Sequence, residues 1–418
     1  MFAGAERLQL RQLLEEQQRA AAELAEFRAD FEALVDCLRE SGVKLPGRLD
    51  RQQVGLAPAT AEGVLSSPRP ASLIFAGAGH AAWSTAMQAS RGARSSAKDA
   101  QEERLFVAGG IPYAGDNITL SHVESLDIRS GEWWRAEPKM SFGRSGHVAA
   151  VLGSYLYVCG GRYPAARSVI CYTPVHECWK PLAPMNTPRT FAGAAVINKE
   201  IHVVCGADDV ESGAAAWDSV ESMCPEGARR TSPWVTLPGT AQRRFAPAAV
   251  ALRGQLFLCG GCKRSSPTST DVRKADTAEW FLLDAAESEA VASMTSPRMH
   301  HTAVVANGVV FVFGGTIPGH PTGLKSVESY DPSANAWSEL PGLEMVRECV
   351  GHATVYSSGF LYVMGGGIRT AGCPAVSSVQ RLDFATGVWE EFQPMLQGRG
   401  AFCAGVITCG PTAARWDL

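Results

Sequence analysis

The stretch Leu105-Phe106-Val107-Ala108-Gly109-Gly110 decides the fold, because its form recurs along the chain: a short apolar run that ends in a glycine pair. The other intact glycine pairs are Gly160-Gly161, Gly260-Gly261, Gly314-Gly315 and Gly365-Gly366. An altered copy, residues 201–207, fills the gap between the second and third pairs. The copies are about 50 residues apart, and a constant period of this length indicates a repeat architecture.

Each unit carries a second apolar stretch after its glycine pair. It reads Val123-Glu124-Ser125-Leu126-Asp127 in the first unit and Val327-Glu328-Ser329-Tyr330-Asp331 in the fifth. A tryptophan usually follows ten residues after the valine, and we expect Ala290 to occupy its place in the fourth unit. Because a tryptophan fills more space than an alanine, that unit is predicted to pack less well.

A methionine and an arginine close most units. The spacing Met-x-x-x-Arg occurs at Met140/Arg144, Met185/Arg189, Met294/Arg298 and Met395/Arg399. An apolar strand follows each arginine, and a short turn then leads to the next glycine pair. Each unit therefore holds about four short strands and no helix, and four-stranded sheets that repeat in this way are the blades of a propeller.

The end of the chain predicts how the ring closes. Residues 401–407 copy the strand that follows each arginine, but no glycine pair comes after them. The first glycine pair, in turn, has no convincing strand immediately before its apolar run. We therefore expect this terminal strand to complete the first blade, so that residues 101–409 form an all-β, six-bladed propeller without open sheet edges.

The residues before the repeats read differently. Residues 1–45 show apolar positions at steps of three and four, which predicts an α-helical segment: a helical hairpin, a docking helix or a self-associating coiled coil. Residues 46–100 read as a linker followed by a degenerate repeat, and residues 410–418 as a tail.

Composition excludes several classes of protein. Apolar residues make up 46% of the chain and charged residues 19%, with a net charge of −4. A nucleic-acid or membrane-surface binder usually shows a basic face, so neither partner is expected. The twelve cysteines are scattered, and no signal-peptide core is visible, which predicts reduced thiols in the cytoplasm, with the nucleus as the alternative.

No stretch carries recognisable catalytic chemistry. Cys259 and Cys262 have the spacing of a metal knuckle, but a second pair is missing and the glycine pair between them explains the spacing. His147, the pair His300-His301 and His352 lie shortly after the repeat arginines, and their recurrence at one repeat position favours loop or strand-start packing over metal binding. We therefore predict no enzyme, no cofactor and no metal site.

The repeat arginines are the candidate partner-binding residues. Two interpretations remain open: each arginine bonds to strand ends and loop carbonyls, or together they form a basic rim that grips acidic peptide segments through forked donors. The candidates are Arg144, Arg189, Arg244, Arg298, Arg347 and Arg399. Loops of variable length near 207–219, 262–279 and 316–325 are further places for partner selection.

The order of glycine pair, Val-Glu-Ser-Tyr-Asp-Pro, tryptophan and Met-x-x-x-Arg resembles the kelch repeat over about three quarters of the chain. Among kelch proteins, it resembles most the Kelch-like proteins. In that family a BTB domain binds cullin-3, a helical BACK domain follows, and the propeller holds the substrate for ubiquitination. No BTB domain is recognised in this sequence, and residues 1–45 could correspond to a remnant of BACK.

The resemblance implies a protein-binding propeller that acts as a substrate-recognition adaptor of a cullin-3 ubiquitin ligase, with its protein substrate on one rim. The alternative is a cytoskeletal, actin-associated or scaffold kelch protein without a ligase role. Copper oxidases similar to galactose oxidase also carry kelch-like propellers, but no stretch of this sequence resembles their metal-binding segments.

Overall fold

The computed structural model describes residues 102–409, except for short stretches at 114–117, 137, 163, 175, 209–215, 226–233, 264–272, 275, 319, 321 and 368–372. The expected helical segment at 1–45, the linker and degenerate repeat at 46–100, and the tail at 410–418 all lie outside the described residues. Within the described part, no helix is long and apolar enough to cross a membrane.

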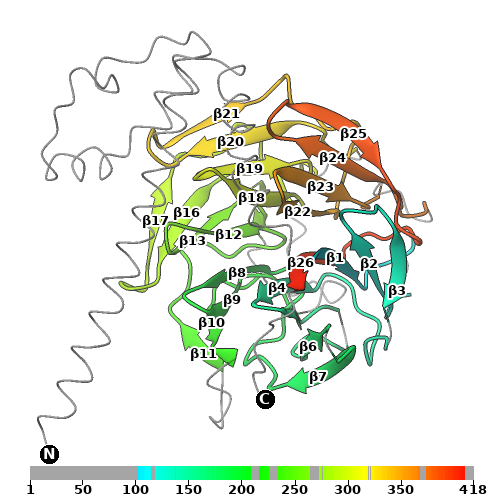
Figure 1. Cartoon of the computed structure of the whole chain (residues 1–418). Helices are drawn as coiled ribbons and strands as arrows, with labels where there is room; N and C mark the ends of the chain where they lie inside the picture. Colours follow the sequence, from blue (N-terminus) through cyan, green and yellow to red (C-terminus); the bar gives the residue numbers. More distant parts are fainter. Residues whose placement is uncertain are drawn as a thin grey trace, which may run out of the picture. The chain divides into compact units, whose positions relative to one another are not determined.

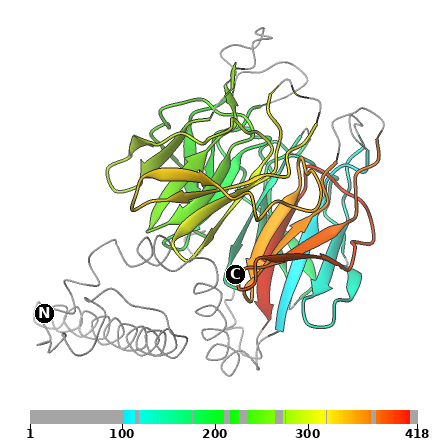
Figure 2. The same cartoon turned by 90° about the horizontal axis from the view of Figure 1, so that it is seen from above.

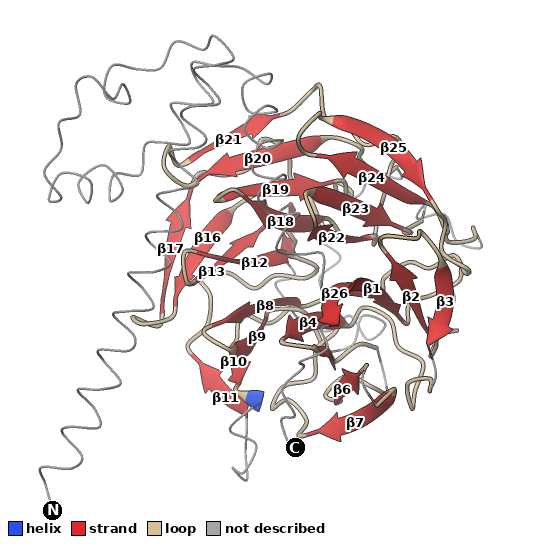
Figure 3. Cartoon of the chain, in the orientation of Figure 1, coloured by secondary structure: helices blue, strands red, loops and turns tan. Residues whose placement is uncertain are grey.

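Six four-stranded antiparallel sheets surround a common axis, as the sequence period predicts (Figure 1). We number these sheets blade 1 to blade 6 along the chain. Within each blade the strands are ordered from the inner strand near the axis to the outer strand at the rim. Figure 3 shows that the described part consists mainly of strands and the loops between them. Figure 2 shows the blades edge-on, with the strands running between two faces joined by loops.

The first three blades have the following strands. Blade 1 contains β26 (Cys403–Cys409), β1 (Glu102–Ala108), β2 (Val123–Asp127) and β3 (Trp133–Ala136). Blade 2 contains β4 (Val148–Leu152), β5 (Tyr155–Cys159), β6 (Val169–Thr173) and β7 (Cys178–Leu182). Blade 3 contains β8 (Gly193–Ile197), β9 (Glu200–Val204), β10 (Val220–Met223) and β11 (Trp234–Leu237).

The remaining blades follow the same plan. Blade 4 contains β12 (Ala248–Leu252), β13 (Gln255–Cys259), β16 (Ala278–Leu282) and β17 (Glu287–Val291), with a separate hairpin of β14 (Cys262–Lys263) and β15 (Arg273–Lys274). Blade 5 contains β18 (Thr302–Ala306), β19 (Val309–Phe313), β20 (Val327–Asp331) and β21 (Ala336–Glu339). Blade 6 contains β22 (Ala353–Ser357), β23 (Phe360–Met364), β24 (Val379–Asp383) and β25 (Val388–Phe392).

The terminal strand closes the ring, as the spare strand in the sequence predicts. β26 pairs with β1 along its length, from Glu102 opposite Cys409 to Ala108 opposite Cys403. As the inner strand of blade 1, it also contacts the inner strands of blades 2 and 6. The first blade is thus built from both ends of the repeat region, and β1 is paired on both of its edges, with β2 and with β26.

Apolar side chains fill the spaces between neighbouring blades. Phe106 of blade 1 packs against Tyr172 of blade 2, with ring centroids 5.5 Å apart, and Phe257 of blade 4 stacks on Tyr330 of blade 5 at 4.9 Å. Aromatic pairs at such distances add to the stability gained from burial alone. The core of this protein is therefore a set of layers between blades.

Tryptophans on the outer strands join five of the six blades, all except blade 4, to the loop before them. Each indole Nε1 donates a hydrogen bond to a backbone carbonyl of the preceding inter-blade loop at 2.8–3.1 Å, from Trp133, Trp179, Trp234, Trp337 and Trp389. In blade 4 the prediction for Ala290 was wrong by two residues. Phe281 lies opposite Ser288, as Leu126 lies opposite Trp133, so Ser288 occupies the tryptophan position.

Candidate functional site

Two sets of loops build one face of the propeller, which we call the loop face. The inter-blade loops join the outer strand of one blade to the inner strand of the next, and the glycine loops follow each glycine pair. Backbone bonds join the two sets: Phe245 pairs with Cys262, and Met299 pairs with Thr316. These bonds hold the loop bases firmly, so the loop face is a rigid support for side chains of varied chemistry.

A closed ring of backbone hydrogen bonds surrounds the axis at this face. One residue from each inter-blade loop takes part in this ring. Its backbone N–H donates a hydrogen bond to the backbone carbonyl of the equivalent residue in the preceding inter-blade loop, with N···O distances of 2.6–3.3 Å. All of them have φ between 51° and 63°. The members are Gly146, Phe191, Ala246, His300, Gly351 and Ala401. We call these residues the mouth ring.

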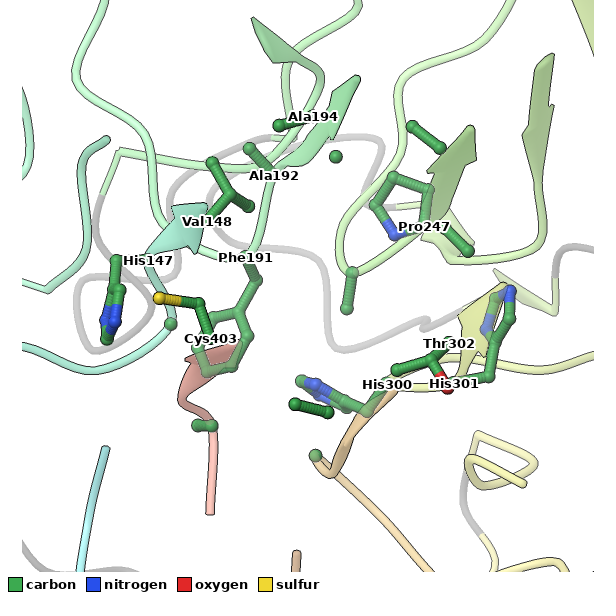
Figure 4. Close-up of a pocket in the computed structure, with 18 of the residues that line it drawn as sticks. His147, Val148, Phe191, Ala192, Ala194, Pro247, His300, His301, Thr302 and Cys403 are labelled. Atoms are coloured by element: carbon green, nitrogen blue, oxygen red, sulfur yellow. The ribbon is translucent and has the colours of Figure 1, made fainter. Parts of the chain in front are cut away.

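A pocket of about 210 Å³ opens beneath the mouth ring along the axis (Figure 4). Its wall is formed by the mouth ring and by the starts of the inner strands, and neither Asp, Glu, Lys nor Arg lines it. Figure 4 shows Phe191, Pro247, His300 and Cys403 approaching the pocket from different blades. Small residues such as Gly193 and Ala194 leave the axial space open.

Three buried histidines line this pocket, at the position directly after the mouth ring. Burial, together with the smaller effect of the neighbouring Arg144 and Arg298 guanidiniums, respectively, lowers the pKa of His147 and of His301 to about 3. Burial lowers the pKa of His352 to about 4. The imidazoles are therefore neutral at pH 7, and His352 Nε2 lies 2.8 Å from the Thr302 hydroxyl.

The repeat arginines lie below the loops. Five of the six candidates have side chains that are completely or almost completely buried: Arg144, Arg189, Arg244, Arg298 and Arg399. While the blades stay packed, a partner's carboxylate cannot reach these guanidiniums. Their contacts match the structural interpretation, and this geometry does not support the acidic-peptide interpretation for these five residues.

Arg298 shows what such an arginine does. Its Nη1 donates to the carbonyls of Gly314 and Ser326 at 3.0 Å, and its Nε donates to the buried Glu328 carboxylate at 2.9 Å. The second Glu328 oxygen accepts the backbone N–H of Thr295 at 2.8 Å. One ion pair thus joins the inter-blade loop that follows blade 4 to blade 5.

Three other blade interfaces repeat this arrangement. In each, a buried arginine pairs with a buried glutamate at the second position of the third strand, after a valine or, in blade 4, after Ala278: Arg189 with Glu221, Arg244 with Glu279, and Arg399 with Glu124. We call these the Arg–Glu interfaces. The glutamate of the Val-Glu-Ser motif is a functional residue of the scaffold that the sequence interpretation missed.

The interface between blades 1 and 2 lacks the glutamate. Ile170 occupies its position, since Ile170 lies opposite Val158 as Glu328 lies opposite Val312. Arg144 remains buried there, where its Nη1 donates to the Gly160 carbonyl at 3.3 Å. Among the residues that the structure describes, its Nε has no hydrogen-bond partner, and burial lowers the pKa of the guanidinium.

The interface between blades 5 and 6 lacks both charges. Gly315 donates to the carbonyl of Cys349, as the equivalent Gly261 does to that of Arg298, so Cys349 holds the arginine position. Its partner is Gln380, whose Nε2 lies 3.6 Å from the Cys349 Sγ. The assignment of Arg347 to the arginine set was therefore wrong by two residues.

Arg347 lies instead at the rim. Its side chain is 51% exposed and pairs at 2.5 Å with Glu391, which is 61% exposed. Among the six candidates it is the one that a partner can reach. Partner binding by Arg347 stays a prediction.

The buried cysteines show no feature of a reactive or metal-binding site. Burial raises the pKa of the Cys259 thiol to about 12, and Cys262 is buried in the hairpin that pairs with Phe245. Within the described ranges, no group of three or more His, Cys, Asp or Glu side chains is placed to hold a metal ion.

A ring of six blades, closed by a terminal strand and joined by repeated Arg–Glu and tryptophan contacts, defines a repeat propeller. Family models identify the repeats: the "Kelch motif" matches residues 143–186, and the "KLHDC2/KLHL20/DRC7 Kelch-repeats domain" matches residues 230–408. Residues 143–186 and 230–408 of the propeller therefore carry kelch repeats, as their motifs predict.

Curated relatives carry the same resemblance. Kelch-like protein 23 from Pongo abelii is 29% identical over 256 residues, and that from Homo sapiens is 28% identical; both alignments cover 60% of this chain. Kelch-like protein 33 from Homo sapiens is 34% identical over 142 residues, which cover 32% of this chain and 25% of the relative. The chain spans 42% of the length of the Kelch-like protein 23 relatives.

Proposed function

We propose that this chain recognises a protein substrate through its loop face and delivers it to a cullin-3 ubiquitin ligase in the cytoplasm. The observation that carries the proposal is the loop face itself. Its loops stand on a closed ring of backbone bonds and surround a pocket, which is the arrangement expected where binding residues are displayed on a rigid scaffold. The similarity to Kelch-like proteins supports the ligase step.

The test is capture of the tagged full chain from cells, with cullin-3 measured by immunoblot. One arm uses the chain alone, and the other adds a co-expressed full-length Kelch-like protein that carries a BTB domain. We expect cullin-3 in the second arm, which would show indirect recruitment, while recovery in the first arm would show direct recruitment.

Absence of cullin-3 from both arms would contradict the ligase role. Co-sedimentation of the purified chain with actin filaments, in that case, would favour the scaffold alternative. Val235→Ala is a suitable control variant for these experiments, because Val235 is exposed on the outer strand β11 of blade 3, away from the mouth ring.

A further inference from the structure

The mouth ring is symmetric in its backbone but not in its side chains. Phe191 and His300 carry large rings and are separated in the mouth ring by Ala246 alone. The other three members are glycine or alanine. The axial opening therefore has a bulky half and an open half.

Phe191 and His300 form an aromatic wall that packs against a third ring. Their rings meet edge-to-face with centroids 4.8 Å apart, and both contact the ring of Phe245, at 5.1 Å and 5.6 Å respectively. Phe245 is 5% exposed, whereas Phe191 and His300 are half-buried. The buried Phe245 ring packs against the other two rings, which keep part of their surface accessible to a ligand.

The lining of the opening combines polar and apolar surface and carries no acidic residue, lysine or arginine. Its buried histidines are neutral at pH 7. The backbone N–H and C=O groups of the mouth ring bond to one another. An acidic segment would find no counter-charge here, and burial of an unpaired charge is costly.

The size of the pocket limits its occupant. A volume of about 210 Å³ is below the roughly 300–1,000 Å³ of small-molecule sites. It is enough for one large side chain delivered from outside by a partner segment. The open half at Gly351 and Ala401 gives such a side chain room to enter beside the aromatic wall.

We propose that the partner protein inserts one uncharged, large apolar side chain into the axial opening, against the wall of Phe191 and His300. This inference rests on the proposed function, because it specifies the segment that the loop face recognises. The partner is thus selected by an apolar anchor rather than by a run of acidic residues.

The test is selection of a displayed library of random 12-residue peptides on the purified full chain. Enriched peptides should share one Leu, Met, Phe or Trp, and replacing that residue with Ala should weaken binding at least tenfold. The variant Phe191→Gly removes half of the wall and should weaken the selected peptides about tenfold. The protein should stay folded, because glycine adopts φ near 51° without strain.

A second variant fills the opening instead of removing its wall. Ala401→Leu adds a side chain in the open half, at a position where a non-glycine residue already has φ of 51°, and should also weaken binding at least tenfold. Val235→Ala should leave binding unchanged. Thermal unfolding of each variant would verify that it is folded.

Three results would overturn the inference. The library could enrich acidic peptides that bind through Arg347 and ignore Phe191→Gly, it could enrich apolar peptides that ignore both mouth variants, or it could enrich none. The first two would leave a protein-binding propeller in place, and the cullin-3 capture above tests the ligase role separately.

Discussion

The interface between blades 4 and 5 and the interface between blades 1 and 2 both bury an arginine, but they differ in whether a carboxylate lies beside it. Arg298 lies between two blades with a buried carboxylate beside it, whereas Arg144 lies in the equivalent place beside Ile170. Both guanidiniums donate to the carbonyl of a glycine of the next blade's pair, Gly314 or Gly160.

This difference separates two roles of the arginine. Hydrogen bonds from the arginine to the backbone are present at both interfaces. The glutamate carboxylate is present between blades 4 and 5, where Glu328 also accepts the backbone N–H of Thr295 in the inter-blade loop. Without a glutamate, the loop that carries the exposed Phe142 has no such carboxylate anchor on blade 2. The interface between blades 1 and 2 is therefore predicted to be the weaker one.

The largest effect is expected when the ion pair of the stronger interface is broken. Glu328→Gln leaves the buried Arg298 guanidinium without its counter-charge, and such a loss costs about 3–5 kcal/mol of the free energy of unfolding. Urea unfolding followed by tryptophan fluorescence measures it. Arg144→Met, which removes a cation that has no carboxylate partner, is the matched control and should cost far less; equal losses would contradict the comparison.

Acid should weaken both interfaces together, because a neutral buried histidine lies beside each arginine. The folded-state pKa values of His147 and His301 are about 3, below the value near 6.5 in the unfolded chain. Below pH 6.5 the unfolded state therefore binds more protons, and stability falls with pH by up to about 1.4 kcal/mol per pH unit for each histidine.

Urea unfolding between pH 7 and pH 4.5 measures this slope. His301→Gln should reduce it, whereas His176→Gln, at an exposed turn, should not. A slope unchanged by His301→Gln would show that this imidazole is not held neutral by the fold.

A smaller effect is expected from giving the weaker interface its missing carboxylate. Ile170→Glu should stabilise the protein when Arg144 is present and destabilise it in an Arg144→Met background, because the new carboxylate then has no counter-charge. The coupling free energy from this double-mutant cycle should be about 1–3 kcal/mol. A coupling near zero would mean that the two side chains do not meet as Arg298 and Glu328 do.

The smallest effect is expected between blades 5 and 6, where Cys349 and Gln380 take the places of the buried arginine and glutamate and the ion pair of Arg347 with Glu391 is exposed. Gln380→Met removes the bonds of a neutral amide to Cys349 Sγ and to the backbone N–H of Arg347, at a cost of about 1 kcal/mol. The same unfolding assay measures it. A loss as large as that of Glu328→Gln would contradict the view that charge sets the strength of an interface.

The repeat period and the spare strand at residues 401–407 were enough to predict the ring and its closure, because glycine pairs and strand copies are visible in sequence. The role of the arginines could not be predicted, since a recurring arginine looks the same in sequence whether it faces solvent or a buried carboxylate. The signal existed: Glu124, Glu221 and Glu328 recur after valine in the same units.

The registers at two places were also predicted wrongly for physical reasons. Cys349 replaces an arginine, so the nearby Arg347 was taken for it, and Ala278 replaces the valine from which the tryptophan position is counted. The axial pocket was not foreseen, because a mouth ring depends on residues that are far apart in sequence and share only a backbone conformation.

The mouth ring has a consequence for how such a protein can change its partner. Its bonds involve only main-chain atoms, so the identity of each of its side chains is uncoupled from closure of the circle. Substitutions at these positions can exchange an aromatic group for a small one without disturbing the support below. The same propeller can thereby acquire new ligands through substitutions at the few positions that surround its axis.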